Sequence, residues 1–188
     1  MVPSNKYPHT QVETLTEMPS RVLFEAELKN QVENHPGNVA LLVMDLDDIK
    51  FINDTDGHLE GDRTILHAWN VLDESVRHGP KRHSDVFRWA GDEFTVLLYG
   101  VDTTEKLVVI EQRLSDNLAA ASIKASFAGS VHQASELQDD FFHRVDAAML
   151  EKKQERKRLE FAELPAHKRI AGRLGSKLIT FAGIKPPR

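Results

Sequence analysis

Two strand-like runs flank a short acidic turn in the stretch VFRWAGDEFTVLLY, residues 86–99. Residues 86–89 and 93–99 are rich in the β-branched, aromatic and aliphatic side chains that favour strands, and Ala90-Gly91-Asp92 between them is typical of a hairpin turn. This hairpin places two adjacent carboxylates, Asp92 and Glu93, at the end of a predicted sheet. We therefore regard this acidic turn as one of the two sharpest candidate functional features of the chain.

A second buried strand is predicted upstream, at residues 39–44, where an apolar run follows the turn Pro36-Gly37. Its polar end, Asp45-Leu46-Asp47-Asp48, places three carboxylates where the strand leaves the core. If this strand neighbours the hairpin, Asp45 converges with Asp92 and Glu93. Oxygen ligands without His or Cys select a hard cation such as Mg²⁺, and that combination suits phosphoryl or nucleotidyl transfer. The alternative is that these acidic residues are solvated strand ends without a ligand.

Helical periodicity is found on both sides of these strands. We expect a first helix ahead of Pro36, a long helix from about Leu59, another over residues 107–118, a strand over 123–130, and a last helix from Phe141 into residues 152–158. Helices alternate with strands, and one hairpin is present. This order predicts an α/β sandwich in which a central, mainly antiparallel sheet is flanked by helices.

A polar, glycine-containing loop is expected at residues 53–62, between the acidic strand end and the long helix. Its amide Asn53 and its carboxylate Asp62 can together recognise a guanine edge. The carboxylate accepts from N1–H and from the exocyclic amine, and adenine offers no matching donors there. The alternative is that Asp62 only stabilises the N-terminal turn of the helix.

The composition of the 188 residues is that of a globular protein, with 40% apolar and 28% charged residues. The chain has no cysteine, which excludes thiol catalysis, thiolate metal sites and disulfides. The longest apolar run is far too short to form a transmembrane segment, and the first residues lack the basic and apolar regions of a signal peptide. We expect a cytoplasmic location.

Charge is distributed unevenly along the chain. Residues 1–150 hold 13 Lys and Arg against 25 Asp and Glu, whereas residues 151–188 hold 11 against 4. The acidic body argues against nucleic-acid wrapping. The basic tail is expected either to dock on the acidic body, which we favour, or to bind an anionic partner such as lipid or nucleic acid.

Several motifs, in the right order, resemble those of the GGDEF domain of diguanylate cyclases. Residues 45–54, followed by Gly57-His58 and Gly61-Asp62, resemble D-x-D-x-F-K-x-x-N-D…G-H-x-x-G-D, and residues 88–94, RWAGDEF, resemble R-Y-G-G-D-E-F. An entry segment at 13–21 and a downstream segment at 146–153 match further family patterns. The resemblance predicts a flexible arm at 1–12, a GGDEF domain at 13–158 and a basic extension at 159–188.

This resemblance implies a palm-like, nucleotidyl cyclase-like fold. Each domain would bind one GTP, and a homodimer would condense two GTP into cyclic di-GMP. Mg²⁺, or Mn²⁺ in its place, would be held by Asp45, Asp92 and the Leu46 carbonyl, with Glu93 in the same acidic turn. The remaining matched positions would read guanine (Asn53, Asp62), hold phosphates (Lys50, Lys153, Lys157) and order the turn (Arg88).

The sequence departs from the family pattern at a few positions. Ala90 replaces the first glycine of the signature, and its methyl would weaken the site if the backbone there needs a positive φ or must approach a phosphate closely. Because every metal and guanine position is kept, we favour an active cyclase. The alternative is a degenerate GGDEF domain that binds GTP or cyclic di-GMP as a regulatory module. Asp62 argues against a related cyclase with another product, because it suits guanine.

The family's product-inhibition motif, R-x-x-D, is shifted in this chain. Arg82-His83-Ser84-Asp85 has the pattern but stands one residue closer to the signature than the family spacing. We therefore expect Arg82 and Asp85 to lie in an ordinary loop with a surface ion pair rather than to clamp cyclic di-GMP.

Overall fold

The computed structural model describes residues 18–76 and 84–163. The elements follow one another as α1 (Arg21–Asn34), β1 (Val39–Leu46), α2 (Ile49–Asp56), α3 (His58–Val76), β2 (Ser84–Ala90), β3 (Glu93–Tyr99), α4 (Thr104–Ala120), β4 (Ala125–Val131) and α5 (Gln138–Glu163). The chain divides after Leu150 into two compact units. The predicted arm 1–12, Arg82 and most of the basic extension lie outside the described residues.

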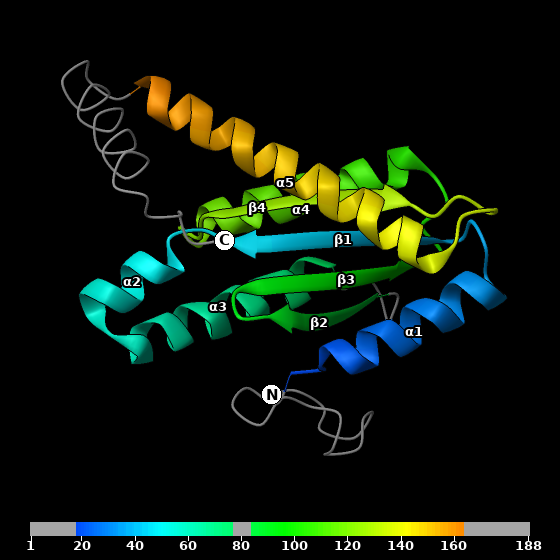
Figure 1. The fold of residues 1–188 in the computed structure, drawn as a ribbon, viewed down its shortest axis with the longest axis horizontal. Helices are drawn as coiled ribbons and strands as arrows, with labels where there is room; N and C mark the ends of the chain where they lie inside the picture. Colours follow the sequence, from blue (N-terminus) through cyan, green and yellow to red (C-terminus); the bar gives the residue numbers. More distant parts are fainter. Residues whose placement is uncertain (1–17, 77–83, 164–188) are drawn as a thin grey trace, which may run out of the picture. The chain divides into compact units, whose positions relative to one another are not determined.

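The four described strands form one sheet in the order β2-β3-β1-β4 (Figure 1). Every neighbouring pair is antiparallel, which confirms the predicted class of sheet. The predicted hairpin is the β2–β3 pair, with a register shift between Arg88 and Ala90. All eight residues of β1 are buried, Asp45 included. An apolar run such as residues 39–44 is typical of a strand whose sheet is covered on both faces.

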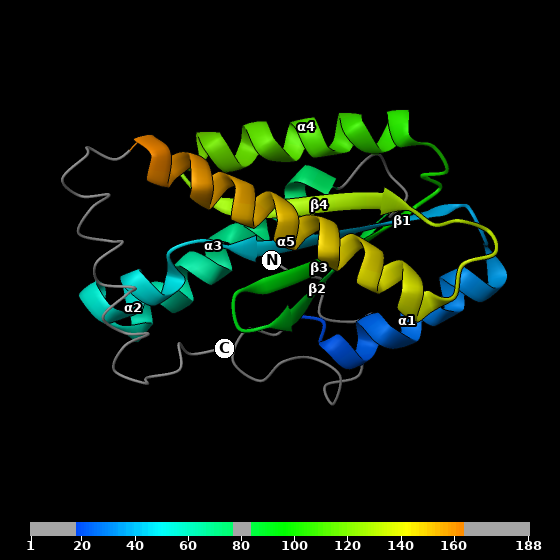
Figure 2. The same ribbon diagram turned by 45° about the horizontal axis from the view of Figure 1, so that its top comes forward.

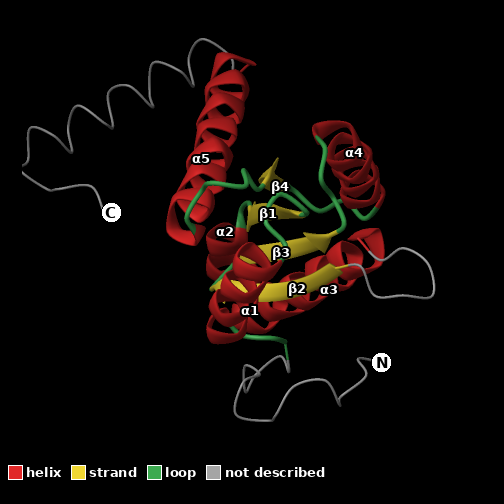
Figure 3. Ribbon diagram, turned by 90° about the vertical axis from the view of Figure 1, so that its right-hand side faces the viewer, coloured by secondary structure: helices red, strands yellow, loops and turns green. Residues whose placement is uncertain are grey.

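Helices cover both faces of the sheet (Figure 3). Successive side chains of a strand point to opposite faces, so the apolar side chains on each face need a layer of helices to bury them. On one face, Leu41 and Val43 of β1 pack with Phe24 of α1 and Phe141 of α5. On the other face, the alternate strand residues pack with α2, α3 and α4 through side chains that include Trp69. This arrangement confirms an antiparallel sheet flanked by helices.

One end of the sheet gathers the segments that the sequence identified as functional. Figures 1 and 2 both show the β2–β3 turn at the same end of the sheet as the C-terminal end of β1, and the α2–α3 connection farther out beyond that end. Only Asp47 and Asp48 separate β1 from α2, so the chain passes directly from the acidic strand end into the α2–α3 pair.

The predicted polar loop at 53–62 is largely helical. Residues 53–56 complete α2, and α3 begins at His58, so only Gly57 separates the two helices. Gly57 has a φ of 90° and a ψ of 160°, a conformation that glycine adopts without strain. The expectation of a loop was wrong because a run of Asn, Asp and Thr is also compatible with a short helix that ends at a glycine.

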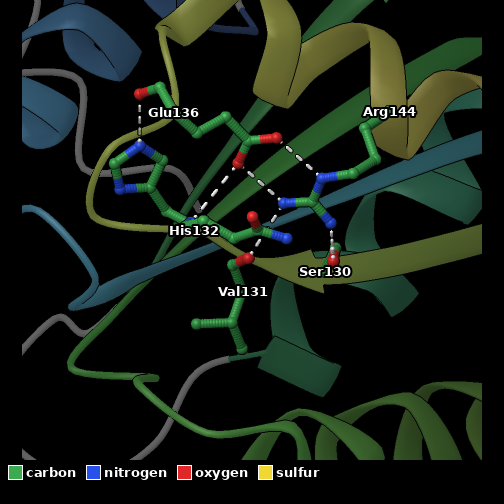
Figure 4. Close-up of polar contacts among 6 residues, drawn as sticks. Ser130, Val131, His132, Glu136 and Arg144 are labelled. Atoms are coloured by element: carbon green, nitrogen blue, oxygen red, sulfur yellow. Dashed lines mark hydrogen bonds and ion pairs between the residues drawn. The ribbon is translucent and has the colours of Figure 1, made fainter.

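A polar cluster, which we call the Arg144 clasp, joins α5 to β4 at the opposite end of the sheet (Figure 4). Arg144 Nε and Nη2 each donate to a carboxylate oxygen of Glu136 at 2.7 Å. Its Nη2 also donates to the Val131 carbonyl at 3.1 Å, and its Nη1 donates to Ser130 Oγ. His132 Nδ1 accepts from the Gly37 amide at 3.1 Å, which extends the clasp to the turn before β1.

None of the helices in the described ranges 18–76 and 84–163 is both long and apolar enough to cross a bilayer.

Candidate functional site

Asp45 lies at the end of β1 with only 6% of its surface exposed. In the sheet it is paired directly with Glu93 of β3 on one side and with Ser126 of β4 on the other. Side chains of directly paired residues project from the same face of an antiparallel sheet. The predicted condition for convergence, that these strands be neighbours, is therefore met.

The acidic turn is fixed to β1 and to its own strand by hydrogen bonds. The Leu46 amide donates to the Asp92 carbonyl at 3.0 Å, which ties the turn to the end of β1. Arg88, 8% exposed, donates from Nε and Nη2 to the Gly91 carbonyl at 2.9 and 2.7 Å. A forked guanidinium on one carbonyl oxygen holds the turn in place, as expected of a residue that orders it.

Ala90 occupies a backbone conformation that any residue adopts. Among the described residues other than glycine, only Asp48 and Ser122 have a positive φ. The positive φ of the turn falls on Gly91, at 41°, and a side chain added there would meet no atom within 4 Å. Alanine at position 90 of the signature could have weakened the site through backbone strain or by obstructing a phosphate. The structure removes the first of these objections.

The donor atoms at this end of the sheet are all oxygens, so they fit a hard divalent cation rather than zinc or copper. No three His, Asp or Glu side chains of the described ranges gather as a metal-binding group. The predicted ligands are two carboxylates, Asp45 and Asp92, with the Leu46 carbonyl. Ser126 Oγ, paired in register with Asp45, is buried and has no hydrogen-bond partner among the described residues. A buried Ser126 hydroxyl without a hydrogen-bond partner, paired in register with Asp45, is compatible with a site that binds a cation and its water molecules.

Helices α2 and α3 bring the side chain of Asn53 against Gly61, the residue that precedes Asp62. Asn53 and Asp62 are both half-buried. A Cβ built on Gly61, the residue before Asp62, would lie 2.9 Å from Asn53 Cγ and closer still to Oδ1. The Asn53 amide therefore rests on the backbone of α3 immediately beside Asp62.

The predicted phosphate-binding lysines occupy two helices. Lys50 is exposed in the first turn of α2. Lys153 and Lys157 lie one turn apart in α5, within the second unit, and share a helix face. Arg156 in the same turn is 3.9 Å from Glu160, so this part of the helix carries both signs of charge.

Asp85 does not lie in a surface loop. It belongs to β2, is 1% exposed and accepts a hydrogen bond from Tyr99 Oη at 2.8 Å. The expected surface ion pair therefore has no support at this position, because a buried carboxylate with a tyrosine partner is not presented to solvent. Arg82, the other half of the pair, is outside the described residues.

Two residues of the site had no predicted role. Ser126 falls within the strand predicted over residues 123–130, and its pairing with Asp45 depends on a contact between segments far apart in the chain. Gly61 was noted as part of a motif, but its contact with Asn53 requires two adjacent helices. A glycine inside an otherwise regular helix was the available signal, because glycine there costs stability unless close packing requires it.

Comparison with known proteins gives consistent relatives. DgcZ, a diguanylate cyclase of Escherichia coli K12, is 30% identical over 152 residues, which cover 76% of this chain and 50% of the relative. DgcM, a diguanylate cyclase of the same strain, is 34% identical over 115 residues, 58% of this chain and 27% of the relative. The chain thus spans half or less of these curated relatives.

Among solved structures, the diguanylate cyclase SiaD of Pseudomonas aeruginosa, in complex with its activator SiaC, matches with a TM-score of 0.69 and 26% identity. The match covers 77% of this chain and 58% of that one. The family model described as diguanylate cyclase, GGDEF domain, matches residues 10–158, most of the 188 residues. With its acidic sheet end and its paired α2–α3 helices, this chain belongs to the GGDEF-domain family.

Proposed function

We propose that this protein is a diguanylate cyclase, which condenses two GTP into cyclic di-GMP and two pyrophosphates. The observation that carries the proposal is the meeting of Asp45 with the Asp92-Glu93 turn at one end of the sheet, next to the α2–α3 pair that carries Asn53 and Asp62. A nucleotide whose base lies on α2 and α3 would direct its phosphates towards the acidic end. The diguanylate cyclases among the relatives support the same reading.

Guanine would be selected by Asp62 and Asn53. The Asp62 carboxylate would accept from guanine N1–H and the exocyclic amine, and the Asn53 amide would complete the edge. Adenine presents no donor at the N1 position and would leave the half-buried carboxylate without a partner. Such a mismatch costs more than the lost bond itself, because the protein group stays desolvated.

Asp45, Asp92 and the Leu46 carbonyl would hold Mg²⁺, or Mn²⁺ in its place. The bound cation would acidify the attacking hydroxyl and neutralise charge on the phosphate under attack. Arg88 keeps the turn, and with it Asp92, in position through the Gly91 carbonyl. Glu93 adds negative charge at the same end, which favours retention of a divalent cation.

Positive charge for the phosphates would come from Lys50 on α2 and from Lys153 and Lys157 on α5. Lysine is suited to this task because its ammonium is a mobile point charge with three donors. These residues would bind and orient the triphosphate.

Catalysis requires two copies of the domain, because one copy offers one acidic end and one guanine-reading pair. Each GTP would present its 3′-hydroxyl to the α-phosphate of the GTP held by the other copy. In each of the two transfers a 3′-oxygen–phosphorus bond forms, the bond to the pyrophosphate oxygen breaks, and the hydroxyl proton passes to solvent. The product is then symmetric, with two equivalent phosphodiester bonds.

The alternative, a degenerate domain that only binds GTP or cyclic di-GMP, is weakened by the geometry of Ala90. Its backbone does not need glycine, and the positive φ of the turn is carried by Gly91. The variant signature is therefore compatible with an ordered acidic turn.

Incubation of the purified protein with GTP and Mg²⁺, followed by mass analysis of the nucleotides, tests the proposal directly. We expect cyclic di-GMP and pyrophosphate in a 1:2 ratio, and none after chelation of the metal. Nucleotide binding without any product would favour the regulatory module, and a different cyclic product would reject the proposed condensation of two GTP. The Asp92→Ala protein serves as the matched inactive control.

A further inference from the structure

Gly61 is a buried glycine inside a regular helix. It lies in the first turns of α3, and its amide donates to the Gly57 carbonyl at 3.3 Å, so its conformation is helical rather than strained. Alanine has the highest intrinsic preference for helix and glycine one of the lowest. A glycine here is therefore not explained by α3 itself.

The side chain of Asn53 supplies the explanation. A Cβ on Gly61 would lie 2.9 Å from Asn53 Cγ and 3.4 Å from Nδ2, and still closer to Oδ1. Real Cβ atoms do not approach other heavy atoms to less than 3.0 Å, so alanine at 61 and the observed amide position exclude each other. The amide occupies the volume that any side chain at position 61 would need.

One further contact and the order of the chain fix this arrangement. The Gly57 amide donates to the Asn53 carbonyl at 3.1 Å, which fixes the backbone of Asn53 at the end of α2. Asp62 follows Gly61 directly on α3. The backbone of one helix thus determines where the amide of the other lies relative to the Asp62 carboxylate.

We propose that Gly61 is a positioning residue for base selection. Because it has no side chain, the Asn53 amide can pack directly against the backbone of α3 at the residue before Asp62. The inference rests on the proposed reading of guanine by Asn53 and Asp62 and adds to it the residue that sets their spacing. A methyl group at 61 would turn the Asn53 amide away, and the end of a side chain can move without unfolding either helix. The preference for guanine over adenine would be lost, and the protein would still fold.

The Gly61→Ala protein tests this inference. We expect the dissociation constant of GDP, which has the same base as GTP, to rise about 10- to 100-fold, because the hydrogen bonds of one amide are lost. The preference for GDP over ADP should fall by the same factor. In turnover, KM for GTP should rise while kcat at saturating GTP stays within about threefold of wild type, and the melting temperature should not fall.

Gly129→Ala is the matched control. Gly129 lies in β4, and a Cβ there would meet Leu107 Cδ1 at 3.1 Å and Glu111 Oε1 at 3.2 Å, which are also ends of side chains. This substitution adds the same methyl at a crowded position that has no link to Asn53. It should leave the preference for GDP over ADP unchanged, so a general effect of glycine replacement is detected separately.

Asn53→Ala provides the decisive comparison. In that background there is no amide to displace, so adding Gly61→Ala should change GDP affinity by less than twofold. Equal losses in both backgrounds would overturn the inference, as would an unaltered GDP preference in Gly61→Ala or failure of that variant to fold. If the wild type binds GDP no better than ADP, guanine recognition itself fails, and the inference fails with it.

Discussion

Asp45 and Asp92 carry the proposed chemistry at the scale of single residues. They reach one end of the sheet from separate segments, and the hydrogen bond from the Leu46 amide to the Asp92 carbonyl joins those segments. Asp45→Ala or Asp92→Ala should reduce the turnover of GTP at least ~10³-fold, because about 4 kcal/mol of charge stabilisation corresponds to three decades of rate. Pyrophosphate release measures the loss, and thermal unfolding verifies the fold.

Asp116→Ala is the control for these two variants, because Asp116 is an exposed carboxylate on α4 that accepts a hydrogen bond from Gln112, one turn earlier in the same helix. It should retain full turnover. Near-normal activity of the Asp92→Ala protein would contradict the assignment of the cation to this end of the sheet.

The variant signature residue gives a second prediction at this scale. Ala90→Gly restores the glycine that the family has at this position. Since Ala90 has no positive φ and its side chain is exposed, we expect turnover within about threefold of wild type and a slightly lower stability, as glycine increases the freedom of the unfolded chain. A gain of tenfold or more would mean that the methyl group obstructs the nucleotide.

At the scale of elements, the sequence was sufficient where the pattern is local. The hairpin, the apolar strand β1 and the amphipathic helices follow from side chains within a few residues of one another. Helix α2 was missed because only Ile49 and Ile52 mark its apolar side, and its polar residues are equally common in loops. The strand order and the packing of Asn53 against Gly61 depend on contacts between elements, and the periodicity of side chains along the chain does not encode such contacts.

The Arg144 clasp gives an element-scale prediction that depends on pH. The hydrogen bonds from Arg144 lower the pKa of Glu136, and burial of the carboxylate opposes them only in part. A carboxyl whose pKa is lower in the folded state stabilises the fold above its unfolded pKa of about 4.3 and loses that contribution as the pH falls through the lower folded value. The Arg144 clasp therefore makes its full contribution to the free energy of unfolding at neutral pH.

Glu136→Gln should lower the free energy of unfolding by about 1–2 kcal/mol at pH 7, an estimate reduced for the partial exposure of Arg144. The difference from wild type should narrow as the pH falls below about 4.3, where the Glu136 carboxyl of the unfolded chain binds a proton, and should disappear once the pH passes below the lower pKa of the folded state. Urea unfolding at several pH values measures both quantities. A difference that stays constant down to the acid limit would show that the charge of Glu136 contributes nothing.

At the scale of the whole molecule, the uneven charge predicts a role for the basic tail. We expect the basic extension, residues 159–188, to dock on the acidic body, since that surface is always present at high effective concentration. A chain ended after Glu163 keeps α5 complete and removes residues 164–188 of that extension. It should melt at a lower temperature or shift towards monomer, and sedimentation measures the shift. If stability, assembly and turnover are all unchanged, the tail binds an outside partner or none.

Assembly is the last property that the proposed mechanism requires. In the proposed mechanism one copy would hold one GTP, at one acidic end and one guanine-reading pair, and could not complete a cyclic dinucleotide alone. Below the dimer dissociation constant the initial rate should therefore rise with the square of protein concentration, and above it in direct proportion. Initial rates over a hundredfold range of dilution, with sedimentation under the same conditions, test this relation. An inert carrier protein at constant total concentration controls for adsorption. A rate proportional to concentration throughout a range in which the protein is monomeric would mean that one copy suffices, and the two-copy mechanism would have to be abandoned.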